Sequence, residues 1–214
     1  MRIRALASWV VTVLLSGCSQ LPQTHYYVLE IDRADSAAGA GATAGDGVTS
    51  DADRSGALTI GVRPFVVDPP YDQERIVYRV GDRSPEVGFY SYHLWAAPLS
   101  SMLPTAVAAG LAGAAGVEEI EPVASGRSYG AFLLGRVLAV EEVDVDHRQL
   151  VRAAIELRLM GSDGEELWRD RVDARGETTT GEVPAIVEAL GQALARALAE
   201  TRGRLASALS AIER

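Results

Sequence analysis

The chain has 214 residues, a formal net charge of −9 and one cysteine. A chain this acidic is not expected to bind nucleic acid, because phosphate contacts require clustered basic side chains and no basic patch interrupts the acids. A single cysteine excludes an internal disulfide. The length suffices for one domain with a hydrophobic core, and we expect one.

The amino terminus has the parts of a bacterial lipoprotein signal peptide. Arg2 and Arg4 precede an apolar run from Ala5 to Leu15, and the run ends in Leu15-Ser16-Gly17-Cys18. A charged region, an apolar region and small residues before the cleavage site are typical of secretory signals. The run is well short of the ~20 residues that span a bilayer, which argues against a plain signal anchor with an incidental cysteine.

We therefore predict that residues 1–17 are removed and that Cys18 carries diacylglycerol and an N-acyl chain. The mature part would have 197 residues, and its net charge would be −11 because Arg2 and Arg4 leave with the signal peptide. Ser19 is not the Asp that favours retention in the inner membrane, so we expect the periplasmic face of the outer membrane. A tether of residues 18–25 reaches no more than ~30 Å, which keeps the body close to the bilayer.

The rest of the chain predicts an α/β (α+β) domain over residues 26–214. Residues 33–57 are Ala, Gly, Ser, Thr and Asp with almost nothing large and apolar, which predicts a flexible insertion. Aromatic, β-branched or alternating segments predict strands over Tyr26–Ile31, Leu58–Val67, Arg75–Val80, Glu86–Tyr92, Val117–Val123, Tyr129–Val145, Leu150–Met160 and Leu167–Ala174.

Two segments have the apolar spacing of helices. The first has its apolar spacing from Leu94 to about Ala114, and we expect Trp95 to open this helix. The second helix is expected over Val183–Ile212. The alternation of Leu150–Met160 is typical of an antiparallel strand with one wet face. We expect a mixed or antiparallel sheet packed by these two helices, and the end of the long second helix to reach a partner or to be solvated.

No motif in the sequence supports an enzyme. The histidines are His25, His93 and His147, and none lies in a pattern typical of a hydrolytic triad. His147 is near Asp144 and Asp146, but these acids alternate with valines and are expected on a solvent face. Once Cys18 is acylated no thiol remains for zinc. We therefore predict no catalytic residue, no metal and no cofactor other than the lipid.

An aromatic cluster precedes the first predicted helix and consists of Phe89, Tyr90, Tyr92, His93 and Trp95. Such a cluster is ordinary in a hydrophobic core, but as an exposed patch it would mark a contact surface. The sequence leaves both interpretations open.

Several segments in order resemble the ABC-type transport auxiliary lipoproteins. They are the lipobox at Cys18, Tyr26-Tyr27-Val28-Leu29, Ile60-Gly61-Val62, Pro70 to Arg79, and Tyr92 to Leu99. The insertion after the first strand is longer than in that pattern, and the tract around Asp72-Gln73 differs from it. The resemblance implies a fold similar to the amino-terminal domain of TolB and no catalytic residues.

The resemblance also implies service to an MCE-type ABC system that moves lipids across the periplasm, by docking or ring formation. The expected partners are then an MCE-domain protein, the membrane and another copy of the chain. The candidate contact residues are Tyr71, Arg75, Tyr92 and Trp95. Two other functions remain open. One is a carrier that holds acyl chains between the sheet and the first helix, and the other is a pilus or secretion-system lipoprotein.

Overall fold

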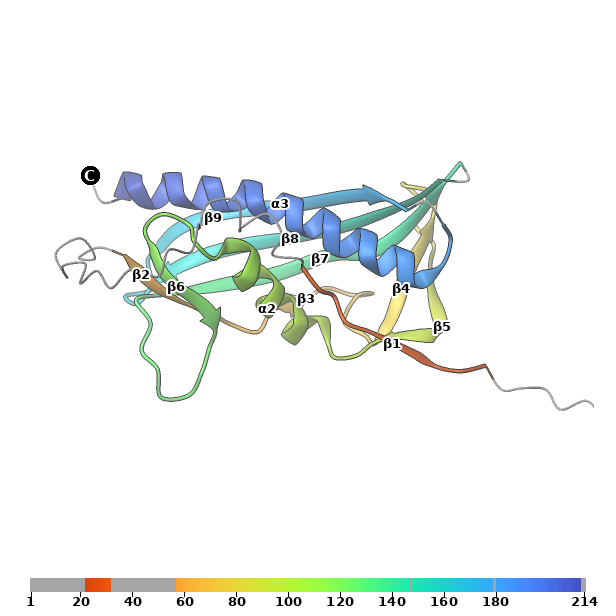
Figure 1. Cartoon of the computed structure of the whole chain (residues 1–214), viewed down its shortest axis with the longest axis horizontal. Coiled ribbons are helices and arrows are strands. Elements are labelled where there is room, and N and C mark those ends of the chain that lie inside the picture. The colour runs from red at the N-terminus through yellow and green to blue at the C-terminus, as the bar shows by residue number, and fades with distance from the viewer. Residues whose placement is uncertain (1–21, 32–56, 147, 179, 213–214) are drawn as a thin grey trace, which may run out of the picture.

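The structure is a computed structural model that describes residues 22–31, 57–146, 148–178 and 180–212. In these residues a mixed sheet of nine strands carries two helices over one face (Figure 1). The predicted mixed α+β fold is confirmed. The lipobox, almost all of the predicted insertion and His147 lie outside the described residues.

Three long antiparallel strands form one half of the sheet. They are β7 (Ala131–Val145), β8 (Arg148–Gly161) and β9 (Glu166–Glu177). In β8 the side chains of Ile155, Leu157 and Leu159 are fully buried, whereas those of Glu156 and Arg158 are exposed. The predicted alternation is therefore confirmed, with the apolar face of β8 turned toward the helices.

The other edge of β7 pairs in parallel with three short strands in succession. β2 (Leu58–Val62) pairs with residues 131–133, β3 (Val66–Val67) with 136–137, and β4 (Arg75–Val80) with 141–144. The predicted single strand Leu58–Val67 is thus two strands. The break occurs where the Phe65 amide donates to the Ser100 carbonyl oxygen, which leads the chain away from β7.

Three further strands extend this half of the sheet. β6 (Val117–Pro122) runs parallel to β2, and β5 (Val87–Trp95) runs antiparallel to β4. β1 (His25–Tyr27) pairs in parallel with the last residues of β5. The predicted first strand Tyr26–Ile31 is therefore a strand only at its beginning.

The helices α2 (Leu99–Leu111) and α3 (Val183–Ile212) lie against each other and against the sheet (Figure 1). The prediction that Trp95 opens a helix is wrong, because Trp95 ends β5 and its amide donates to the Glu74 carbonyl oxygen. Pro98 precedes the first turn of α2, and a proline disfavours helical geometry in the residue before it. The predicted bounds of α3 are confirmed.

Candidate functional site: the groove between the amino-terminal segment and α2

The amino-terminal segment, residues 28–31, crosses the helical layer after β1 (Figure 1). Leu29 enters the core and is 5% exposed. The segment also lies directly on α3, since a Cβ atom added at Gly191 would lie 2.4 Å from the Glu30 carbonyl oxygen. A glycine at this point of α3 therefore lets the segment approach the helix backbone.

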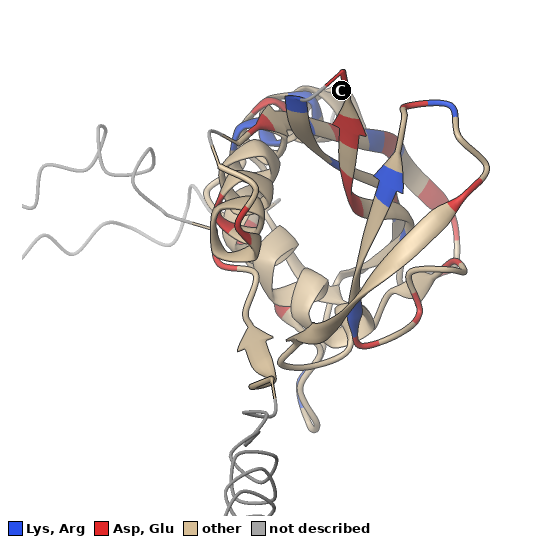
Figure 2. Ribbon diagram, turned by 90° about the vertical axis from the view of Figure 1, so that its right-hand side faces the viewer, with Lys and Arg blue, Asp and Glu red and all other residues tan. Residues whose placement is uncertain are grey.

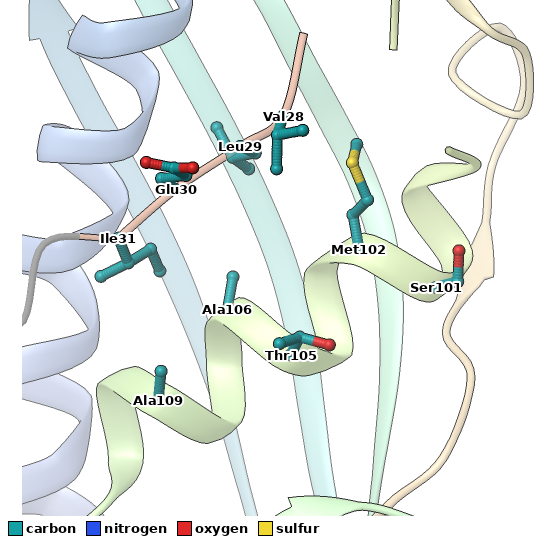
Figure 3. A pocket seen from close by; sticks show the side chains of 9 residues that line it. All are labelled: Val28, Leu29, Glu30, Ile31, Ser101, Met102, Thr105, Ala106 and Ala109. Carbon is teal, nitrogen blue, oxygen red and sulfur yellow. The ribbon is translucent and has the colours of Figure 1, made fainter. Parts of the chain in front are cut away.

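An open groove of about 590 Å³ lies between this segment and α2 (Figure 3). The four residues of the amino-terminal segment line one side, and five residues of α2 line the other. The α2 residues recur at spacings that place them on one side of a helix. The lining residues are Val28, Leu29, Glu30, Ile31, Ser101, Met102, Thr105, Ala106 and Ala109.

The chemistry of the groove suits the binding of an apolar surface. Its only ionisable side chain is that of Glu30, and most of its lining is apolar. The opposite side of α2 presents Leu103, Val107 and Leu111, which are fully buried members of the core. The groove therefore lies on the other side of α2 from these core side chains.

The first described strand is held to β5 by aromatic contacts as well as by the backbone. The rings of His25 and His93 stack with centroids 5.3 Å apart, and the Tyr27 hydroxyl lies 2.8 Å from His93 Nδ1. Partial burial, together with the nearby His25, lowers the pKa of His93. These contacts give His93 a structural role, because they fix β1 in place beside the groove.

The four candidate contact residues have different surroundings. Tyr71 and Trp95 are 4% and 2% exposed, so their side chains belong to the core. Tyr92 is 45% exposed, and Arg75 is exposed beside the Phe89 ring. Of the two interpretations of the aromatic cluster, the core holds for Trp95 and the exposed surface holds for Tyr92. Only Arg75 and Tyr92 remain available for contact with a partner.

A buried ionic network was not predicted from the sequence. Glu141 of β7 is fully buried, accepts a 2.7 Å hydrogen bond from the Tyr71 hydroxyl, and lies 3.2 Å from Arg79. Arg152 of β8 also donates to the Glu141 carboxylate. Burial and the hydrogen bond to Glu141 raise the pKa of Tyr71. The buried Tyr71 hydroxyl group is thus paired within this network.

The neighbouring Glu142 is also buried, on the opposite face of β7. Its carboxylate accepts a short 2.5 Å hydrogen bond from the Tyr90 hydroxyl. Burial raises the pKa of Glu142. The solvent exposure predicted for Asp144 is confirmed, whereas Glu142, two residues earlier in β7, is buried. Two consecutive acids inside an apolar strand are the one sequence signal for these buried carboxylates.

Several arginines on the outer face of the sheet are paired with acids. Arg158 and Arg169 both contact Glu166, at 2.7 and 2.9 Å, and Arg171 contacts Asp173 at 2.9 Å. A view along the long axis shows charged segments of both signs along the strands (Figure 2). Among the strands that the structure describes, this mixture of charges forms no basic stripe of the kind that binds phosphate backbones.

The part of the chain that the structure describes contains no group of three His, Cys, Asp or Glu residues that could hold a metal ion. Within the same residues, neither helix is long and apolar enough to cross a bilayer.

The fold is shared with solved structures of low sequence similarity. Protein XCC0632 from Xanthomonas campestris is 16% identical to this chain, with a TM-score of 0.62 over 73% of this chain and 88% of that one. The crystal structure of an uncharacterized protein is also 16% identical, with a TM-score of 0.58 over 85% of this chain and 97% of that one. No curated protein matches the chain.

These likenesses show that this chain shares its mixed α+β fold with both proteins. The family described as ABC-type transport auxiliary lipoprotein component matches residues 43–201. The chain belongs to this family, as the resemblance predicted. The family consists of auxiliary components of transport and is not a class of enzymes, and its name indicates lipoproteins that serve ABC transporters.

Proposed function

We propose that this protein is the lipid-anchored periplasmic accessory component of an MCE-type ABC lipid transport system. It acts at the outer membrane by docking and assembly, through protein contacts and without catalysis. In this proposal residues 1–17 are the signal peptide, Cys18 carries the lipid, residues 18–25 are the tether and residues 26–214 form one docking domain. Membership of the transport auxiliary family supports the proposal.

The observation that carries the docking role is the open apolar groove beside α2. A docking module needs a packed body and an accessible apolar surface, and the groove lies outside a core in which Leu103 and Val107 are fully buried. A carrier of acyl chains would need an enclosed cavity of several hundred Å³. On the side of α2 where such a cavity is expected, Leu103, Val107 and Leu111 are fully buried members of the core, which supports the docking role.

The test is affinity purification of the lipidated protein from membranes, followed by mass spectrometry of co-purifying proteins and of extracted lipid. We expect an MCE-domain protein to be recovered, and no stoichiometric phospholipid beyond the anchor. Stoichiometric phospholipid without any transporter subunit would refute the docking role in favour of the carrier. Recovery of secretion or pilus proteins would favour the third function.

A matched pair of variants locates the docking surface. Thr105 is exposed, lines the groove and belongs to α2, so Thr105→Arg places a charge in the groove without disturbing the core. Ser210→Arg adds the same charge at an exposed position of α3 outside the groove. We expect Thr105→Arg to reduce recovery of the partner and Ser210→Arg to leave it unchanged. Equal recovery with both variants would remove the groove from the proposal.

A further inference from the structure

A second apolar surface lies at the point where the described chain begins. Tyr26 is 66% exposed and Tyr92 is 45% exposed. These two residues and the exposed Arg75 come from β1, β5 and β4. We refer to them as the β1–β5 corner.

The register of the strands explains why these side chains gather on one face. Tyr26 is aligned with Leu94 in the parallel pair, and Leu94 is aligned with Arg75 in the antiparallel pair. Side chains of aligned residues point to the same face of a sheet. The residues that alternate with them, Tyr27 and Trp95, are aligned with each other and point toward the core.

Tyr92 lies on this face through the ordinary alternation of β5. It is two residues before Leu94, and side chains two residues apart in a strand point to the same face. The ladder between β4 and β5 is irregular from here on, since Arg75 is aligned with Leu94 but Val77 with Phe89, which leaves extra residues in β5. Ser91 and Tyr92 lie in this stretch, and both are exposed.

The corner lies within a short reach of the proposed anchor. Seven residues lie between Cys18 and Tyr26, and the eight steps along the chain allow at most ~29 Å in extended form. The stacking of His25 on His93 and the hydrogen bond of Tyr27 hold β1 to the body. Because the chain leaves the domain at β1, a bilayer that holds the lipid on Cys18 must lie near this corner.

We propose that the β1–β5 corner rests on the phospholipid bilayer that holds the anchor, with Tyr26 and Tyr92 in the headgroup region and Arg75 against lipid phosphates. Tyrosine is favoured at this depth because its ring is apolar and its hydroxyl group stays hydrated. Arginine makes strong charge-assisted hydrogen bonds to phosphate. The inference rests on the proposed lipidation of Cys18, and it assigns Arg75 and Tyr92 to the membrane instead of to a protein partner.

The inference is tested with Tyr92→Trp in the lipidated protein, reconstituted into phosphatidylethanolamine and phosphatidylglycerol vesicles whose acyl chains are brominated. Bromine quenches only tryptophans that lie within the bilayer. Trp95 and Trp168 are 2% and 9% exposed and give a constant background. The matched control is Ile212→Trp, because Ile212 is 53% exposed at the end of α3, on the side of the molecule away from β1 (Figure 1).

We expect the fluorescence added by Tyr92→Trp to be lost in brominated vesicles and retained in unbrominated ones, and that added by Ile212→Trp to be retained in both. Tyr26→Trp provides a second probe and should behave as Tyr92→Trp does. Equal quenching of the corner and control probes would overturn the inference. This result is also expected if a protein partner or a second copy covers the corner.

Failure of the lipidation itself is detected separately. The intact mass of the purified chain shows whether Cys18 carries lipid, and its absence would count against the proposed function. Because Cys18 is the only cysteine, the chain can then be coupled there to a maleimide phospholipid and the same quenching measured. The contact of the corner with a bilayer is thus decided whichever way the anchor is attached.

Discussion

Replacing Glu141 by Gln should strongly destabilise the protein. The substitution keeps the shape of the side chain and an oxygen for the Tyr71 hydroxyl group, but it removes the charge that compensates Arg79 and Arg152. Breaking a buried ion pair by removing one partner costs about 3–5 kcal/mol. The side chains of Arg79 and Arg152 keep 15% and 28% of their surface exposed, which places the expected loss at the lower end, about 3 kcal/mol.

The loss is measured by urea unfolding followed by tryptophan fluorescence. For a domain of this size it corresponds to a fall in Tm of about 6–12 °C. Asp144→Asn is the control, because Asp144 is an exposed acid on the same strand and its replacement should change stability by less than about 0.5 kcal/mol. A loss below about 1 kcal/mol for Glu141→Gln is typical of solvent-screened surface pairs and would refute the reasoning.

Two further predictions concern Glu142 and the packing of two glycines. Burial raises the pKa of Glu142 above its ordinary value of 4.5, so ionisation costs stability as the pH rises from that value through the folded pKa. Urea unfolding at several pH values should therefore show a stability advantage of Glu142→Gln over wild type that grows as the pH rises from about 4.5 through the folded pKa. A difference that does not change with pH would contradict this. Gly135→Ala should cost about 1–3 kcal/mol, because its Cβ would lie 2.5 Å from the Phe65 ring. Gly203→Ala in open space on α3 should instead stabilise by about 0.5–1 kcal/mol, and similar thermal shifts for both would be inconsistent with the packing.

Local patterns were sufficient to predict elements whose two sides differ in exposure. The apolar stripe of Val183–Ile212 and the alternation of Leu150–Met160 each reflect one buried and one wet side, and both predictions agree with the structure. The start of α2 could not be found in this way, because Leu94 and Trp95 continue the helical spacing although they belong to β5. Apolar spacing indicates which side chains are buried but not which backbone conformation carries them there.

The features missed by sequence analysis depend on contacts between distant residues. Glu141 is buried because Tyr71 and Arg79 from other segments reach its carboxylate, whereas period-two reasoning assumes that one face of the strand stays wet. The groove exists because residues 28–31 lie on α2 and α3, and Gly191 of α3 permits this approach. No local pattern in either segment indicates that they meet.

The single edge of β7 shared by β2, β3 and β4 has a consequence for the order of folding. The ladders of β2, β3 and β4 with β7 cannot be completed before the chain has been synthesised and exported as far as Leu133, Val137 and Asp144, respectively. In the proposed function, Cys18 would therefore reach the periplasm and be acylated at the inner membrane while the body is still unfolded. Attachment to a bilayer would then precede folding, and the domain would fold with its anchor already in place.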